Sequence, residues 1–262
     1  MNPRHIYVSI FAVFLFGFLL SQDALAKIAW DKYQNAGVAL ALTRDAKLAM
    51  QIGNYYFNGA KYDLGKAERG YKKAITIDPK ILWGHYQLAR VYFVDKKNDL
   101  ALREINKELE ANAGNVRSYY VRGLINGFSG NLADAEKDFS LFIQFAPREW
   151  AGYNDLAWIL SKEKKYKETI EVLEAAFLQV ESGRENPWLK NALGVAYLNL
   201  KEYKKAIVVF KEARKLADKL TADDWHKAYP GNDKASAEDG LGAVREAIKR
   251  NIETASFVDN SL

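Results

Sequence analysis

The sequence repeats at a period close to 34 residues, and this period limits the fold more than any other feature. One series of small residues has spacings of 34, 34, 34 and 37 residues, and a second series has spacings of 36, 34, 34 and 37. The first series is Ala67, Ala101, Ala135, Thr169 and Ala206, and the second is Gly53, Ala89, Gly123, Ala157 and Gly194. A period of about 20 to 50 residues is typical of arrays in which one structural unit stacks on copies of itself.

Large residues stand at fixed distances from both series. Four residues after the first series come Tyr71, Ile105, Phe139, Leu173 and Phe210, and three after the second come Tyr56, Tyr92, Asn126, Leu160 and Tyr197. Spacings of three and four place side chains on one stripe of a helix. Each unit is therefore predicted to be a pair of antiparallel helices, in which a small residue of one helix lies under a large residue of the other.

These residues resemble the tetratricopeptide repeat. The resemblance rests on Leu193-Gly194-x-x-Tyr197 with Ala206, Phe210 and Ala213, and on Gly53-x-x-Tyr56 with Ala67, Tyr71, Ala74 and Pro79. It covers five units in residues 46–220 and implies an all-α fold, a right-handed superhelical solenoid of antiparallel helix pairs with terminal capping helices. Glu108, Asn126, Ala113 and Asp218 depart from the pattern, the first two at packing positions.

The flanks are predicted to cap the array. Residues 27–45 are predicted to form a leading helix over the first repeat, and residues 221–262 a loop followed by a capping helix. Leu220 to Lys234 contains Pro230-Gly231 and is typical of a loop. Ser236 and Asp239 have the spacing of a capping box at the start of the last helix.

The N-terminus has the three parts of a secretory signal. Arg4 and His5 precede an apolar run from Ile6 to Leu20, and Ala24-Leu25-Ala26 follows. A helix of 15 residues spans about 22 Å, which is short of the roughly 30 Å hydrocarbon core. We therefore predict a signal peptide at residues 1–26 and an exported, periplasmic or envelope-associated protein. The alternative is an uncleaved anchor in the inner membrane.

The composition excludes several classes of chemistry. The chain has no cysteine, so it has no disulfide, thiolate metal site or catalytic thiol. The net charge of +5 is too small to indicate nucleic-acid binding. With His85 and His226 as the sole histidines after residue 26, and no catalytic or phosphate-binding motif, we predict no enzyme, no cofactor and no metal. The less favoured alternative is a metal-dependent accessory protein that uses Asp223, Asp224 and His226.

The resemblance implies a groove, since the first helix of each tetratricopeptide unit lines a concave surface. The positions predicted to face it are Asn54, Trp83, Tyr86, Gln87, Arg90, Arg117, Tyr120, Asn154, Trp158, Trp188 and Asn191. Aromatic, arginine and asparagine side chains bind peptides well, because rings bury area and the polar groups pair with carboxylates and main-chain groups. We therefore expect a protein or peptide partner in a protein-interaction scaffold. The alternative is that the aromatic residues pack against neighbouring repeats.

A second surface also follows from the repeat. The turns at Lys162 to Glu168 and Lys201 to Lys205 each carry a net charge of +2, from four basic and two acidic residues and from three and one. Consecutive turns lie along one edge of a solenoid, so this edge could meet an anionic partner. The alternative is a solvated lysine-rich edge.

Overall fold

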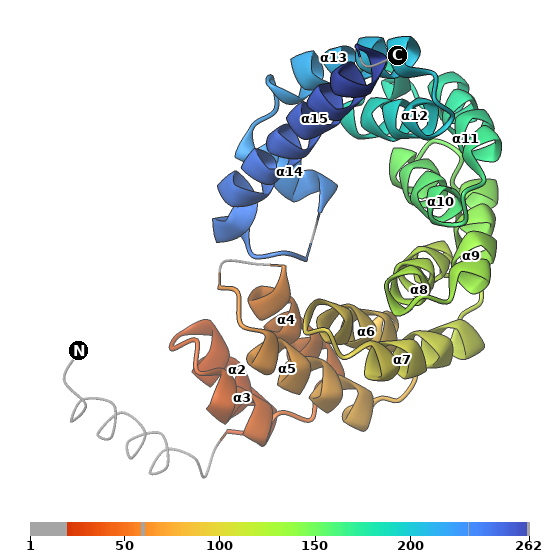
Figure 1. The fold of residues 1–262 in the computed structure, drawn as a ribbon. Coiled ribbons are helices and arrows are strands. Elements are labelled where there is room, and N and C mark those ends of the chain that lie inside the picture. The colour runs from red at the N-terminus through yellow and green to blue at the C-terminus, as the bar shows by residue number, and fades with distance from the viewer. Residues whose placement is uncertain (1–19, 59–60, 230, 261–262) are drawn as a thin grey trace. The chain divides into compact units, whose positions relative to one another are not determined.

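The computed structural model describes residues 20–58, 61–229 and 231–260, and it is all-α, as predicted (Figure 1). Of the residues in these ranges 79% are helical, and they form no strand. The chain divides into two compact units, with unit 1 ending at Lys97 and unit 2 beginning at Asn98. None of the helices in the described ranges is long and apolar enough to cross a membrane. The predicted apolar run from Ile6 to Leu20 lies, apart from its last residue, outside these ranges.

Unit 1 contains five described helices. They are α2 (Gln22–Asp31), α3 (Ala36–Leu42), α4 (Ala46–Phe57), α5 (Leu64–Ile77) and α6 (Gly84–Val94). α2 packs on α3, α4 on α5, and α5 on α6. The segment predicted as one leading helix is thus a helix pair, because Asn35 ends the turn after α2 and caps α3 through the Val38 N–H.

Helix α2 begins inside the segment predicted to be a signal peptide. Ser21 caps it by accepting a hydrogen bond from the Ala24 N–H at 3.2 Å. The Asp23 carboxylate accepts hydrogen bonds from the Arg44 N–H at 2.6 Å and from the Thr43 hydroxyl at 3.3 Å. Ala26 is fully buried. Residues before the predicted cleavage point therefore take part in the packing of unit 1.

Unit 2 contains the remaining helices. They are α7 (Asn98–Ala111), α8 (Val116–Ser129), α9 (Leu132–Phe145), α10 (Trp150–Lys162), α11 (Tyr166–Gln179), α12 (Pro187–Asn199), α13 (Tyr203–Ala217), α14 (Ala222–Ala228) and α15 (Ala237–Asp259). Within this unit α8, α10 and α12 form one layer, and α9, α11 and α13 form the other (Figure 1). The layers follow from pairing each helix with the next one along the chain.

The predicted pairs of small and large residues are confirmed. A Cβ at Gly53 would lie 2.6 Å from the Tyr71 ring, and one at Gly194 would lie 2.5 Å from the Phe210 ring. Gly123 has the same relation to Phe139, at 2.9 Å. The first series of small residues is fully buried in all five repeats. Glycine thus lets each ring lie directly on the facing helix.

The two departures at packing positions, Glu108 and Asn126, each bind a polar side chain nearby. Buried Glu108 accepts a hydrogen bond from the Asn115 amide at 2.9 Å. Asn126, which stands where the pattern has a tyrosine, donates to buried Asp138 at 3.3 Å. Arg122 binds the same carboxylate through two N–H groups at 2.9 and 2.7 Å. Polar groups that are buried in this way need partners, and the chain supplies them locally.

The C-terminal region differs from the prediction in two respects. The segment predicted as a loop contains the short helix α14, and the capping box belongs to this helix, formed by Thr221 and Asp224. Ser236 makes no side-chain cap for α15, so the capping box predicted there is wrong. Helix α15 packs on α13 and α12. Arg245 fixes it by donating to the carbonyls of Ala217, Asp218 and Leu220 at the end of α13.

Candidate functional site

Four of the predicted groove residues of unit 1, Trp83, Tyr86, Gln87 and Arg90, contact one another. Arg90 donates to the Gln87 side chain at 2.8 Å and lies over the rings of Phe57 and Tyr86 at 4.8 and 5.7 Å. Tyr86 is 8% exposed, so it packs rather than lines an open surface. Trp83 precedes α6 in a left-handed conformation with φ of 68° and contacts Tyr86 edge-on. Trp83, which is 39% exposed, is therefore the most accessible member of this set.

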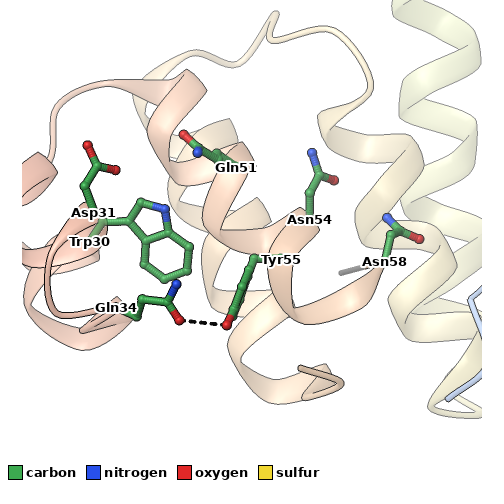
Figure 2. A pocket seen from close by; sticks show the side chains of 7 residues that line it. All are labelled: Trp30, Asp31, Gln34, Gln51, Asn54, Tyr55 and Asn58. Atoms are coloured by element: carbon green, nitrogen blue, oxygen red, sulfur yellow. Dashed lines mark hydrogen bonds between the residues drawn. The ribbon is translucent and has the colours of Figure 1, made fainter. Parts of the chain in front are cut away.

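A hollow of about 540 Å³ lies beside these residues in unit 1 (Figure 2). We call it the amide hollow, and its lining is Trp30, Asp31, Gln34, Gln51, Asn54, Tyr55 and Asn58. Helix α2 and the turn after it supply the first three side chains, and α4 and the residue after it supply the other four. Figure 2 shows the Tyr55 hydroxyl meeting Gln34, with the Trp30 ring beside them. Among the predicted site residues, Asn54 lines this hollow.

The amide groups of the hollow are oriented by their neighbours. Tyr55 donates to the Gln34 oxygen at 2.7 Å, and Tyr71 donates to the Asn54 oxygen at 2.9 Å. An amide side chain whose oxygen is occupied offers its NH₂ group as a donor. The hollow can thus donate hydrogen bonds to acceptors such as the carbonyl groups of an extended peptide.

In unit 2 the predicted residues lie on α8, α10 and α12. We call this surface the first-helix face, defined by Arg117, Tyr120, Asn154, Asp155, Trp158, Trp188 and Asn191. The Tyr120 hydroxyl of α8 donates to the Asp155 carboxylate of α10 at 2.6 Å. The Asn154 amide donates to the second oxygen of the Asp155 carboxylate at 3.0 Å. Trp158 stacks at a tilt on Phe128, with ring centroids 5.0 Å apart. The face therefore holds a carboxylate between fixed donors and rings.

Asp155 has an unusual environment for a carboxylate. Burial raises its pKa to about 6, although the hydrogen bonds from Tyr120 and Asn154 act in the opposite direction. Between about pH 4 and 6 the folded chain then binds more protons at Asp155 than the unfolded chain does. This group therefore lowers the stability of the fold as the pH rises through that range. A carboxylate kept at a cost to stability in a surface of aromatic residues is a candidate for function.

The fifth-repeat members of the face contact the C-terminal region. Trp188 stacks on Trp150 at 5.1 Å between ring centroids and meets Tyr229 edge-on at 6.1 Å. Asn191 accepts a hydrogen bond from the Asn251 amide of α15 at 3.0 Å. At this end the chain's own C-terminal residues thus lie against residues predicted to meet a partner.

Sequence reasoning missed two parts of this arrangement. The sequence does not predict most of the amide hollow, because residues 27–45 are expected only to cover the first repeat; the aromatic and amide residues Trp30, Gln34 and Tyr55 are the signal for it. Tyr229 was overlooked because its segment was predicted to be a loop. The available signal was Thr221 and Asp224, which have capping-box spacing.

The acidic residues of the possible metal cluster and a lysine of the basic edge make local contacts within the chain. Asp223 pairs with Lys227 at 2.7 Å and Asp224 belongs to the capping box of α14. Across the ranges that the structure describes, no group of three or more possible ligands could hold a metal ion.

On the basic edge, Lys165 pairs with both Glu136 and Glu163 at 2.8 Å. Local acidic residues thus offset part of the charge of that edge.

Comparisons with known proteins agree with this fold. A family model for the tetratricopeptide repeat matches residues 189–219. RNA polymerase II-associated protein 3 of Rattus norvegicus is 24% identical over 200 residues, which are 72% of this chain and 29% of that protein. The chain thus spans less than a third of this relative.

Two solved structures are similar at the level of the fold. PilW, described as a widely conserved type IV pilus biogenesis factor, has a TM-score of 0.60 at 17% identity, covering 80% of this chain and 97% of PilW. YrrB, described as a TPR protein with an unusual peptide-binding site, has a TM-score of 0.54 at 17% identity, covering 76% and 95%. The chain therefore has the fold of a tetratricopeptide repeat protein, with a repeat matched directly at residues 189–219.

Proposed function

We propose that this chain is a non-enzymatic interaction scaffold of the cell envelope or periplasm that binds a segment of a partner protein through its first helices. The observation that carries the proposal is the first-helix face of unit 2, where Tyr120 and Asn154 hold the Asp155 carboxylate among aromatic rings. Such a set offers orientation by polar groups and affinity by burial of rings. The amide hollow adds donors suited to peptide carbonyls.

Two similarities support a peptide partner and an envelope location. The structure of YrrB is described by its peptide-binding site, and PilW is described as a factor in the biogenesis of type IV pili. The secretory pattern of residues 1–26 favours export of this chain as well.

Capture of the partner tests the proposal. The full-length chain, tagged at its C-terminus, is crosslinked and purified from cells that make it, beside the variant Asn154→Ala/Trp158→Ala. We expect the wild type to recover one defined protein and this variant to recover about tenfold less, since buried aromatic residues dominate binding energy. The control is Leu178→Ala/Val208→Ala in the second-helix layer, at positions 76% and 56% exposed.

The control variant is expected to recover as much partner as the wild type. Equal recovery by both variants would contradict binding at the first-helix face. Failure of the wild type to recover any defined protein would contradict the scaffold function itself.

A membrane-anchored scaffold is a second candidate, because α2 begins before the predicted cleavage point. Cleavage after Ala26 would remove Ser21 and Asp23, and with them the cap of α2 and the bonds to Arg44 and Thr43. An uncleaved N-terminus would keep these contacts and tether the chain to the inner membrane.

The N-terminal residue of the purified protein separates these two candidates. Retention of the segment before Lys27 is the result expected for the anchored form. A mature chain that begins at Lys27 would exclude the anchor. In that case the truncated α2 is expected to lower the melting temperature of unit 1 relative to a chain that begins at Leu20.

A further inference from the structure

Tyr229, the residue after helix α14, lies beside Trp188 and Asp155 in unit 2. Burial raises the pKa of Tyr229 to about 12, and the nearby Asp155 carboxylate acts in the same direction. The Tyr229 ring also meets Trp188 edge-on. Tyr229 therefore stands close to both the carboxylate and the indole.

The polar groups beneath Tyr229 are incompletely paired. Tyr120 and Asn154 donate to Asp155, but in the part of the chain that the structure describes no lysine or arginine forms an ion pair with it. The Trp188 Nε1 atom is buried and has no hydrogen bond of ordinary geometry, although Tyr229 is nearby. A buried carboxylate without a cation costs free energy, and so does a buried N–H whose nearest acceptor, the Tyr229 hydroxyl, is poorly placed. Both would be satisfied by a ligand that carries a cation next to a carbonyl group.

The aromatic rings that adjoin Tyr229 suit a cation as well. Trp150, Trp188 and Tyr229 form a continuous aromatic set, with centroid distances of 5.1 and 6.1 Å. Aromatic faces attract ammonium and guanidinium groups, most strongly where water is excluded. A lysine or arginine side chain of a peptide brings such a group and a main-chain carbonyl together.

Trp225 is the main buried contact between the covering segment and α15. Trp225 of α14 lies on Gly240 of α15, where a Cβ would come within 2.2 Å of the indole. Trp225 packs there with Ala237 and Leu241. Helix α14 has only seven residues, so loss of this contact would free the segment with little disturbance of the repeats.

We propose that Asp155, Trp188 and Trp150 form a site for a basic side chain, lysine or arginine, of the partner segment, and that α14 with Tyr229 covers this site until the partner displaces it. The proposal rests on the proposed function and specifies the partner: the segment carries a lysine or arginine at this point. Displacement of the cover subtracts from the apparent affinity, because only the uncovered form is competent to bind.

Titration with capped amino acids tests the site without the natural partner. The probes are Nα-acetyl-lysine amide and Nα-acetyl-arginine amide, and Nα-acetyl-norleucine amide is the uncharged match to lysine. Binding to the full-length chain is followed by the NMR signal of the Trp188 indole N–H, assigned with Trp188→Phe. We expect both basic probes to shift this signal and the norleucine probe to bind at least about tenfold more weakly.

Three variants make the test specific. Asp155→Asn is expected to weaken the basic probes about tenfold or more and, at neutral pH, to raise the melting temperature, since it removes a buried charge. A residue that merely supports the fold would lower the melting temperature. Gly240→Ala is expected to tighten the probes, because the added methyl group displaces Trp225, whereas Gly242→Ala, with no atom within 4 Å of its added Cβ, should match the wild type.

Equal binding of lysine and norleucine probes, equal binding by Asp155→Asn and wild type, or no binding even to Gly240→Ala would overturn the site. Equal affinities for Gly240→Ala and Gly242→Ala would overturn the covering role of α14. If the wild type still captures a partner in cells while the basic probes fail, this inference is wrong and the scaffold function stands. If no partner is captured, the scaffold function fails on its own test.

Discussion

Replacement of Arg122 by alanine is expected to destabilise unit 2 by about 3 kcal/mol, the largest effect of any single substitution considered for this chain. Asp138 is 2% exposed, and Arg122 supplies two of its hydrogen bonds. Without the guanidinium the buried carboxylate keeps the single, longer bond from Asn126. The value lies at the lower end for a broken buried pair because the Arg122 side chain is itself 26% exposed.

Urea denaturation of the full-length chain measures this effect. Lys107→Ala is the matched control, because Lys107 pairs with Glu104 while remaining 54% exposed, and its loss should change the midpoint little. The double variant Arg122→Met/Asp138→Leu should recover part of the loss, since it removes both charges but leaves the buried Asn126 amide without its acceptor. Equal midpoints for Arg122→Ala and Lys107→Ala would show that the polar network does not stabilise the repeat.

Gly70→Ala is expected to destabilise unit 1 by about 1 to 3 kcal/mol, even though alanine favours helices over glycine by up to about 1 kcal/mol. A Cβ at Gly70 would lie 2.6 Å from the Gly53 backbone nitrogen and 3.0 Å from the Ala49 carbonyl oxygen. These atoms belong to the backbone of α4 and cannot rotate away. The two helices must therefore move apart.

The control is Gly242→Ala in α15, where the added methyl group meets nothing within 4 Å. There the helix propensity acts alone, and we expect a gain of about 0.5 to 1 kcal/mol. Thermal unfolding of both variants checks the contrast. A rise in melting temperature for Gly70→Ala as large as that for Gly242→Ala would contradict the close approach of α4 and α5.

The fold was predictable because the repeat recurs often enough to reveal its packing rule. Gly194 and Phe210, or Gly123 and Phe139, show the same relation at the same separation, and the structure places each ring on its glycine. The positions that broke the rule, Asn126 among them, were visible as exceptions. The sequence does not show why these positions differ, because the reason is a contact between Arg122 and Asp138, which lie on two different helices.

The candidate site was predictable only in part. Helical spacing placed Tyr120 and Asn154 on the first helices, and the structure brings both to Asp155. It could not show that Tyr229 lies against Trp188, because Tyr229 belongs to a segment that follows the last repeat. Residues that follow the array obey no period, so their packing has to come from the three-dimensional structure.

The most direct test of the scaffold account is site-specific photocrosslinking in the cells that make the protein. A photoreactive amino acid replaces Arg117, an exposed position on the first-helix face, or Leu178, which is 76% exposed in the second-helix layer. The account predicts a crosslink to one partner protein from position 117 and none from position 178. The same crosslink from both positions, or a crosslink from position 178 alone, would contradict it.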